Sequence, residues 1–135
     1  MANKIIIYTD GGARGNPGPA AIGIVIGDKK YGEAIGEATN NVAEYRALVF
    51  ALKKAKSLLG VDAAKAADLE VRSDSELMVN QLNGIYKVKE EGLKPLFIEV
   101  WNAKQEFRNV SFTHVRREEN KIADALVNQA LDTLL

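Results

Sequence analysis

The chain has 135 residues, and 18 Lys and Arg residues balance 18 Asp and Glu residues to a formal net charge of zero. This length fits a single domain spanning residues 1–135, and the 47% hydrophobic content is typical of a globular protein rather than a disordered or fibrous one. Because the sequence has no cysteine and a single histidine, His114, it excludes disulfides, thiolate metal sites and multi-histidine metal sites.

The zero net charge at first argues against a nucleic-acid-binding protein, because such domains are usually basic. The first apolar run, residues 5–8, is too short for a signal peptide. No stretch approaches the roughly 20 apolar residues of a membrane span. We therefore expect a cytoplasmic protein without membrane contact. We also expect a monomer, since nothing in the sequence indicates an obligate partner.

Hydrophobic patterns and turn residues predict elements in the order βββαβααβα. Runs of β-branched and alternating apolar residues predict strands at residues 4–9, 20–26, 31–38, 69–73 and 110–114. Cap signals and helical spacing predict one helix between Thr39-Asn40-Asn41 and Gly60, and others at 75–82, 93–107 and 121–135. Residues 11–19 are predicted to form a turn, and residues 116–120 are predicted to form a charged loop. Gly23 indicates either a bulge in its strand or a close approach of another part of the chain.

This order of elements indicates an α/β fold with a mixed five-stranded sheet flanked by helices. Three strands joined by short turns favour an antiparallel meander. The helix before the fourth strand allows that strand to pair in parallel with the first through a crossover. We therefore expect three antiparallel strands followed by two parallel ones.

Four carboxylates stand at unusual positions in this arrangement. Asp10 and Asp74 end the first and fourth strands, whereas Glu44 and Asp124 lie in the first turns of two helices. If they converge, their mutual repulsion calls for metal ions. An all-oxygen site suits Mg²⁺, and two such ions about 4 Å apart form the clamp used for phosphodiester cleavage.

Each acid alone also has an ordinary structural explanation. Asp10 before two glycines is typical of a turn, and Asp74 before a serine is typical of a helix cap. Glu44 and Asp124 near helix starts are favoured by the helix dipole. Only their joint placement favours a shared site.

Four short motifs occur in a fixed order along the chain. They are Tyr8-Thr9-Asp10-Gly11-Gly12 with Gly15-Asn16-Pro17-Gly18-Pro19, Thr39-Asn40-Asn41 with Glu44, Ser73-Asp74-Ser75, and Arg117-Glu118-Glu119-Asn120 leading to Ala123-Asp124. Together with the order of elements, they resemble a type 1 ribonuclease H over nearly the whole chain. Four motifs in the right order carry far more weight than any one of them.

This resemblance implies an endonuclease that cuts the RNA strand of an RNA–DNA hybrid and leaves 3′-hydroxyl and 5′-phosphate ends. It implies two Mg²⁺ ions, for which Mn²⁺ can substitute. Asp10 would bridge both ions, and Asp124 would help hold the ion that activates the attacking water. Glu44 and Asp74 would hold the ion near the leaving 3′-oxygen, with Glu44 also beside a ribose 2′-hydroxyl.

The same resemblance implies substrate contacts. Asn16, Asn40 and Asn41 match positions that contact the RNA strand, and amide side chains can read a 2′-hydroxyl. Thr39 matches a position that binds a phosphate of the DNA strand. The structural alternatives are helix capping for Thr39, Asn40 or Asn41, and a turn role for Asn16.

The chain departs from the family in two places. Many members carry a loop histidine after the last strand, whereas His114 falls on the strand itself, where its alternation predicts a structural histidine on the inner face. Arg117 is our candidate for the missing role, by holding phosphate or the leaving group, although it could equally be a solvated loop charge.

The second departure is the lack of a basic helical insertion, because stretch 83–94 is short. Tyr86 and Lys87 in this stretch could supply base stacking and a phosphate contact instead. Trp101 lies mid-helix among apolar residues, which predicts a core position.

Three functions remain open from the sequence: a ribonuclease for RNA–DNA hybrids, a non-catalytic binding module for hybrids or double-stranded RNA, and a related nuclease for double-stranded RNA or DNA. The asparagine pattern favours RNA contact, with double-stranded RNA as a possible further substrate. Setting aside the four carboxylates leaves 18 basic against 14 acidic residues, a surplus of four. The neutral total is thus compatible with a polyanionic substrate.

Overall fold

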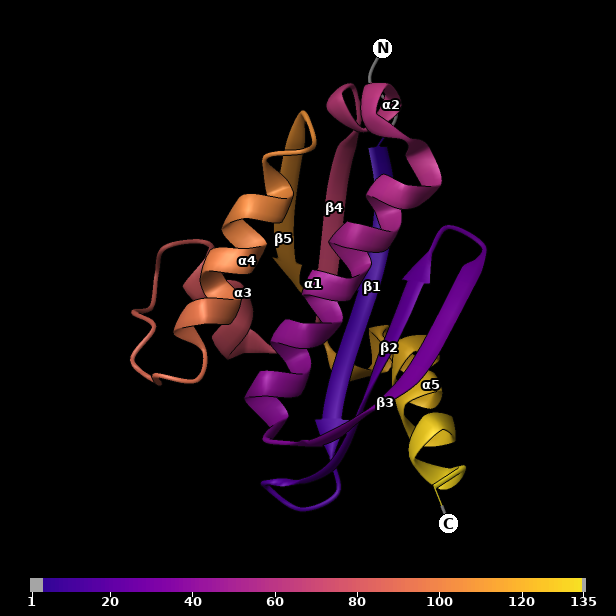
Figure 1. The fold of residues 1–135 in the computed structure, drawn as a ribbon, viewed down its shortest axis with the longest axis vertical. Helices are drawn as coiled ribbons and strands as arrows, with labels where there is room; N and C mark the ends of the chain where they lie inside the picture. The colour runs from indigo at the N-terminus through magenta and orange to yellow at the C-terminus, as the bar shows by residue number, and fades with distance from the viewer. Residues whose placement is uncertain (1–3, 135) are drawn as a thin grey trace.

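Five strands form one mixed sheet in the spatial order β3-β2-β1-β4-β5 in the computed structural model, which describes residues 4–134 (Figure 1). The strands are β1 (Lys4–Ala13), β2 (Gly18–Ile26), β3 (Lys29–Ala38), β4 (Asp68–Ser73) and β5 (Asn109–His114). The helices are α1 (Asn40–Leu59), α2 (Val61–Lys65), α3 (Glu76–Leu82), α4 (Lys94–Lys104) and α5 (Lys121–Asp132), with a 3₁₀ turn, η1, at Arg117–Glu119.

The strand pairing is antiparallel from β1 to β3 and parallel from β1 through β4 to β5. This arrangement confirms the predicted fold class, including the crossover that brings β4 beside β1. The last parallel pair is Thr9 with Ser73. The residues that follow these two therefore start at the same edge of the sheet.

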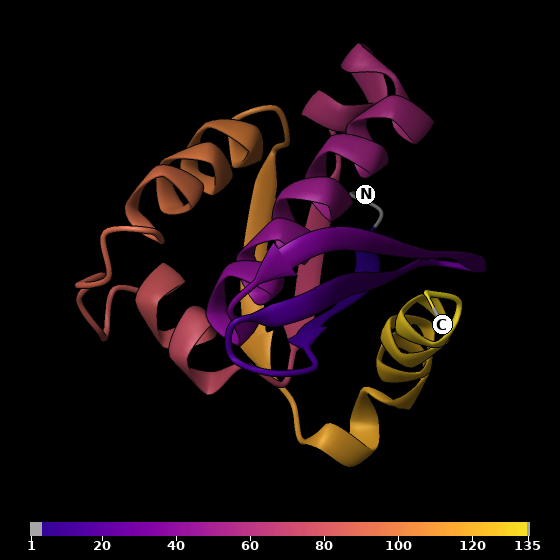
Figure 2. The same cartoon turned by 60° about the horizontal axis from the view of Figure 1, so that its bottom comes forward.

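Helices cover the two faces of the sheet unequally. Helices α1, α3 and α4 lie on one face, and α5 lies on the other, against β1, β2 and β3 (Figures 1 and 2). The main core lies between the sheet and α1. Its largest fully buried apolar side chains are Ile7, Ile24, Tyr45, Leu48, Leu52 and Leu69.

Two glycines allow helices to approach strands closely. A Cβ atom on Gly23 would overlap the carbonyl of Ala123, so the α5 backbone lies directly on β2. A Cβ atom on Gly11 would overlap the backbone of Ala43 and Glu44, at the start of α1. The predicted close approach at Gly23 is confirmed, and Gly11 fixes the position of Glu44 against the end of β1.

Several element boundaries differ from the prediction. The predicted turn at 11–19 is shorter, because β1 and β2 continue their ladder as far as the pair Ala13 and Ala20. The short helix α2 was missed, and part of the predicted loop 116–120 forms η1. Helix α4 ends at Lys104 rather than at residue 107. The end predicted for the last helix, Leu135, lies outside the described residues.

Two aromatic side chains are more exposed than predicted. Trp101 was expected in the core but is 54% exposed, because α4 packs through Val100 and turns its other side to solvent. The Lys104 ammonium lies 4.4 Å from the Trp101 ring centroid. His114 was expected on the inner face but is exposed, because it is the last residue of the edge strand β5.

Within residues 4–134, no helix combines the length and the apolar character that crossing a membrane requires.

Candidate active site

Two aspartates emerge side by side at one edge of the sheet. Asp10 lies at the carboxyl half of β1, and Asp74 directly follows β4. Because these strands are parallel neighbours, both side chains reach the edge where α/β proteins bind ligands. The cap of α3 is Ser75, whose hydroxyl accepts a hydrogen bond from the Met78 amide at 3.3 Å. Helix capping therefore does not account for Asp74.

The first turns of α1 carry Glu44 to the same place. Thr39 caps this helix by accepting a hydrogen bond from the Val42 amide at 3.2 Å. Glu44 is buried, and its Oε1 accepts a hydrogen bond from the Gly11 amide at 3.0 Å. This bond ties the carboxylate of α1 to the strand that carries Asp10.

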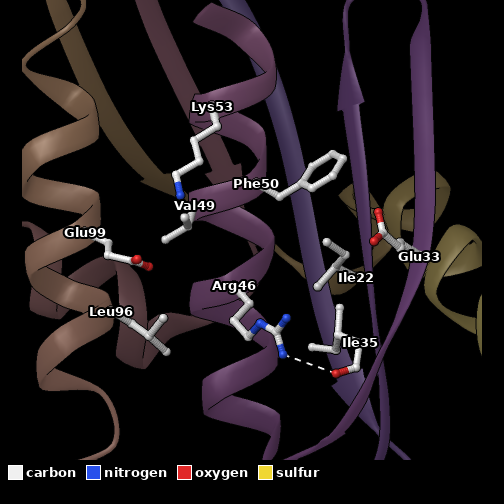
Figure 3. A pocket seen from close by; sticks show the side chains of 9 residues that line it. All are labelled: Ile22, Glu33, Ile35, Arg46, Val49, Phe50, Lys53, Leu96 and Glu99. Carbon is white, nitrogen blue, oxygen red and sulfur yellow. Dashed lines mark hydrogen bonds between the residues drawn. The ribbon is translucent and has the colours of Figure 1, made fainter. Parts of the chain in front are cut away.

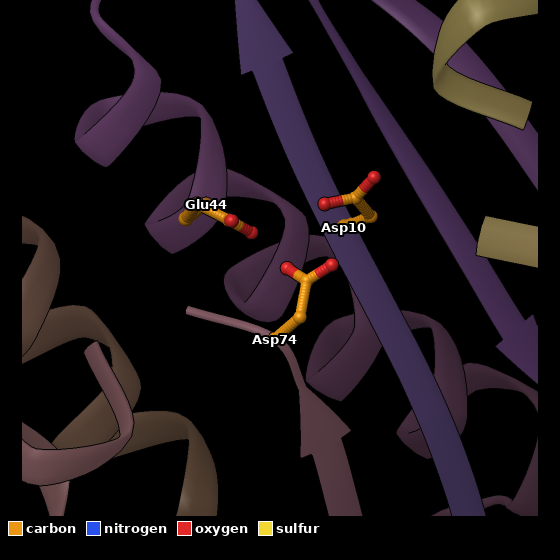
Figure 4. A group of neighbouring side chains, drawn as sticks. All are labelled: Asp10, Glu44 and Asp74. Carbon is orange, nitrogen blue, oxygen red and sulfur yellow. The ribbon is translucent and has the colours of Figure 1, made fainter. Parts of the chain in front are cut away.

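Asp10, Glu44 and Asp74 converge on one point. Each offers a carboxylate oxygen, and these three oxygens all lie within 4.8 Å of one another. Figure 4 shows the side chains directed toward one another from β1, from α1 and from the segment after β4. Three acids from three separate segments of the chain thus lie close enough to contact one ion.

Asp124 faces the same cavity from α5. Its helix is anchored by Asn120, which is 1% exposed and whose Nδ2 donates to the Thr9 carbonyl at 2.9 Å. The Asp124 amide in turn donates to the Asn120 carbonyl at 3.1 Å. The start of α5 is thereby fixed beside the end of β1, although Asp124 is not part of the three-carboxylate group.

A cavity of about 400 Å³ joins these residues. The predicted site residues on its wall are Asp10, Asn40, Glu44, Asp74, Arg117 and Asp124. The wall also includes Arg14 and Asn128, which the sequence analysis did not single out. The only sequence signal for Arg14 is its place between Gly12 and Gly15 in the first motif, and Asn128 lies one helical turn after Asp124.

The electrostatics of the cluster reflect burial of like charges. Burial, followed by the charges of Asp74 and Asp124, raises the pKa of Asp10 to about 8. Burial and the nearby Asp10 and Asp74 carboxylates also raise the pKa of Glu44, which the Gly11 amide and Arg117 oppose only in part. Such a group of oxygen donors fits a hard divalent cation, which would supply the missing positive charge.

The predicted substrate-contacting asparagines brace the turn between β1 and β2 against α1. The Asn40 amide donates to Asn16 Oδ1 at 3.0 Å, and Asn40 Oδ1 accepts from the Ala13 amide at 2.9 Å. Asn41 Nδ2 donates to Glu90 Oε1 at 3.0 Å. Asn16 and Asn40 are therefore positioned by each other, whereas Asn41 is held by Glu90.

Tyr86 and Lys87 lie away from the carboxylates. Both are exposed on the segment between α3 and α4, and neither lines the cavity. The Tyr86 amide donates to the Asn80 carbonyl, and the Lys87 carbonyl accepts from Gln81 Nε2. Their backbones are anchored to α3, and their contact with a substrate stays a prediction.

A second cavity, of about 390 Å³, lies between α1, α4 and the β2–β3 hairpin (Figure 3). Its wall mixes the cations Arg46 and Lys53 with the anions Glu33 and Glu99, and Arg46 donates to the Ile35 carbonyl. Because these charges balance, this cavity does not gather several groups of the same charge as the carboxylate cavity does. The carboxylate cavity is therefore the better candidate for catalysis.

Comparisons with known proteins show which family the chain is similar to. Residues 8–130 match the family described as Reverse transcriptase-like. A bifunctional protein of Mycobacterium tuberculosis is 40% identical over 96% of this chain, and ribonuclease HI of Halobacterium salinarum is 42% identical over 96%. The chain spans only 36% and 65% of the lengths of these two relatives.

Among solved structures, LC11-RNase H1 in complex with an RNA/DNA hybrid superposes with a TM-score of 0.91 at 50% sequence identity. The match covers 96% of this chain and 98% of that one. The family match extends over most of the chain, and the predicted fold agrees with the structural match. The chain therefore belongs to the Reverse transcriptase-like family, within the ribonuclease H-like proteins.

Proposed function

We propose that this chain, as one domain over residues 1–135, is a metal-dependent endoribonuclease that hydrolyses the RNA strand of RNA–DNA hybrids. The observation that carries the proposal is the group of three carboxylates, whose oxygens lie within 4.8 Å of one another at the sheet edge. Membership in the family and the likeness to a structure with a bound hybrid support this substrate. The products would carry 3′-hydroxyl and 5′-phosphate ends.

The acids of the cavity would hold the metal. Asp10 lies near Glu44 and Asp74 and feels the charge of Asp124, and the resemblance to the family implies that it would be shared by two ions. Glu44 and Asp74 would complete one site, and Asp124 would complete the other. Two bound Mg²⁺ ions, or Mn²⁺ in their place, would lower the pKa of the attacking water and neutralise charge on the phosphate.

Arg117 is suited to hold the substrate phosphate. Its guanidinium lines the cavity and acts on the pKa of Glu44, so its charge lies near the acid cluster. Planar donors match the oxygens of a phosphate, and the group stays charged at any working pH. Arg117 would therefore offset charge at the reacting phosphate, where the family's loop histidine is missing.

The motif at the start of α1 would read the sugar of the RNA strand. Asn40 and Asn41 carry amide groups, which can both donate to and accept from a 2′-hydroxyl, with Asn16 beside them. The Thr39 hydroxyl accepts from the Val42 amide, and its own proton can still bind a phosphate of the DNA strand. Tyr86 and Lys87 would extend this contact along the DNA strand.

The decisive experiment compares three labelled duplexes: RNA–DNA hybrid, double-stranded RNA and double-stranded DNA, each with Mg²⁺, with Mn²⁺ and with a chelator. We expect metal-dependent loss of the RNA strand of the hybrid. Asp74→Asn should abolish it, whereas Glu76→Gln, on the adjacent exposed turn of α3, should not.

Other outcomes select other functions. Binding of the hybrid without cleavage would favour a non-catalytic module. Additional cleavage of double-stranded RNA would broaden the substrate class. Cleavage of the DNA duplex would contradict the proposed substrate.

A further inference from the structure

Arg14 is a second arginine in the carboxylate cavity. It lies in the turn between β1 and β2, where its amide donates to the Pro19 carbonyl at 2.8 Å. Its side chain lines the cavity and is 45% exposed. The residue thus combines a backbone held in a tight turn with a cation that solvent and substrate can reach.

The guanidinium of Arg14 is held from outside the cavity. Its Nη2 lies 2.6 Å from Oδ1 of Asp132, at the far end of α5 and 118 residues away in sequence. Asp132 itself is 62% exposed and is not among the residues that line the cavity. The pair uses only one edge of the guanidinium, which carries further donors on Nε and Nη1.

An exposed pair of this kind contributes little to stability, because solvent screens it and both side chains lose freedom. A phosphate group, by contrast, offers two oxygens to the same planar donors. A nucleic-acid strand that approaches four carboxylates also needs cations close to its path. Arg117 supplies one from the η1 turn, and Arg14 supplies the other from the β1–β2 turn.

We infer that Arg14 binds a phosphate of the nucleic-acid strand next to the carboxylate cluster, and that Asp132 competes with this phosphate for the guanidinium. This inference rests on the proposed function, because it takes a nucleic-acid strand to enter the cavity. When the substrate binds, its phosphate replaces the Asp132 carboxylate on the Arg14 guanidinium, or both groups contact the guanidinium together.

The structure offers a matched control for this role. Arg108 and Asp68 also form an exposed arginine–aspartate pair between segments distant in sequence. That pair lies where β4 and β5 begin, at the opposite end of these strands from Asp74. Arg108→Gln therefore removes the same charge and breaks the same kind of pair, but away from the cavity.

The test measures the dissociation constant of a fluorescent RNA–DNA hybrid in Mg²⁺, in an Asp74→Asn background that blocks cleavage. We expect Arg14→Gln to weaken binding about 10-fold and to lower the slope of log Kd against log salt concentration by about one. Arg14→Lys should recover part of the loss, because it restores charge without the planar fork. Arg108→Gln should change binding less than twofold.

Asp132→Asn separates binding from structure. It breaks the same ion pair as Arg14→Gln, so a purely structural role predicts equal weakening of binding in both variants. Our inference predicts that Asp132→Asn leaves affinity unchanged or raises it, because it removes a competing negative charge. Thermal unfolding of both variants reports any shared loss of stability.

The inference is overturned if Arg14→Gln binds like Arg108→Gln, or if Arg14→Gln and Asp132→Asn weaken binding equally. The proposed function is tested separately by cleavage of the hybrid with the unaltered chain. If that chain binds the hybrid through Arg14 but does not cut it, only the catalytic proposal fails.

Discussion

Two buried acids on neighbouring strands have pKa values that are shifted in opposite directions. Glu70 on β4 and Asp10 on β1 are 7% and 6% exposed. Hydrogen bonds from Arg72 and Lys4 lower the pKa of Glu70 to about 2, whereas burial and neighbouring acids raise the pKa of Asp10 to about 8. Similar burial thus produces a structural ion pair at one place and an uncompensated acid at the other.

The difference comes from the partners that each side chain meets. Glu70 lies 2.9 Å from both Arg72 Nε and Lys4 Nζ, and Tyr8 accepts a further hydrogen bond from Arg72 at 2.8 Å. Asp10 meets Glu44, Asp74 and Asp124 instead. A group of buried acids whose charges are only partly offset by cations costs stability, and such groups are found where function requires them.

The largest expected effect is that of Asp10→Asn on catalysis. Because Asp10 would contact both metal ions, its loss should lower the cleavage rate by about 1,000-fold or more. Steady-state rates on a hybrid check this. Asp28→Asn, in the exposed β2–β3 turn, is the charge-matched control and should cleave normally. Near-normal turnover of Asp10→Asn would remove this acid from the mechanism.

The second prediction concerns pH and uses the metal-free protein. The folded-state pKa of Asp10 lies above its ordinary value of 3.8, so the unfolded chain loses this proton first as pH rises. Stability should therefore fall between about pH 4 and pH 8, by up to about 5 kcal/mol, with Glu44 acting in the same direction. Denaturant unfolding in a chelator at pH 5 and pH 8 measures it.

Asp10→Asn provides the control for this pH dependence, since it removes the acid while keeping its shape. The variant should be more stable than the unaltered chain at pH 8 and should lose part of the slope. If both proteins show the same slope, Asp10 is not the group responsible.

The third prediction tests the compensated acid. Glu70→Gln should lower the free energy of unfolding at neutral pH by about 2 kcal/mol, because Arg72 and Lys4 lose their charged partner. Since the folded-state pKa of Glu70 is depressed, its contribution should persist at neutral pH and disappear as pH falls from about 4 toward 2. The turnover number of the Glu70→Gln variant should stay within twofold of that of the unaltered chain. A large loss of turnover would link this network to the active site.

The smallest expected effects separate Arg117 from His114. Arg117 lines the carboxylate cavity, whereas His114 is exposed on the last position of β5 and does not line it. We expect Arg117→Ala to lower turnover about 10-fold and His114→Ala less than twofold. Steady-state rates on the same hybrid measure both effects. A larger loss of turnover in His114→Ala than in Arg117→Ala would assign the role of the loop histidine to His114.

Local sequence signals were sufficient for most of the fold. The β-branched run before Asp10, the cap at Thr39 and the stop at Gly60 each act within a few residues, so they predicted β1 and α1 well. The wrong predictions concern element boundaries, the short helix α2 and the exposure of side chains. Trp101 follows an apolar pattern, but α4 is covered on one side only, and the sequence does not show which neighbour covers a helix.

The sequence by itself determined the order of most strands and helices along the chain, the four acids and the asparagine motif, because strand periodicity, caps and motif spacing are local properties of the chain. Only the tertiary structure decided which charges are compensated. It joined Glu70 to Lys4, placed three acids within 4.8 Å, and brought Arg14 to Asp132 across 118 positions. Electrostatic energy depends on distance in space and on burial, and the folded chain sets both.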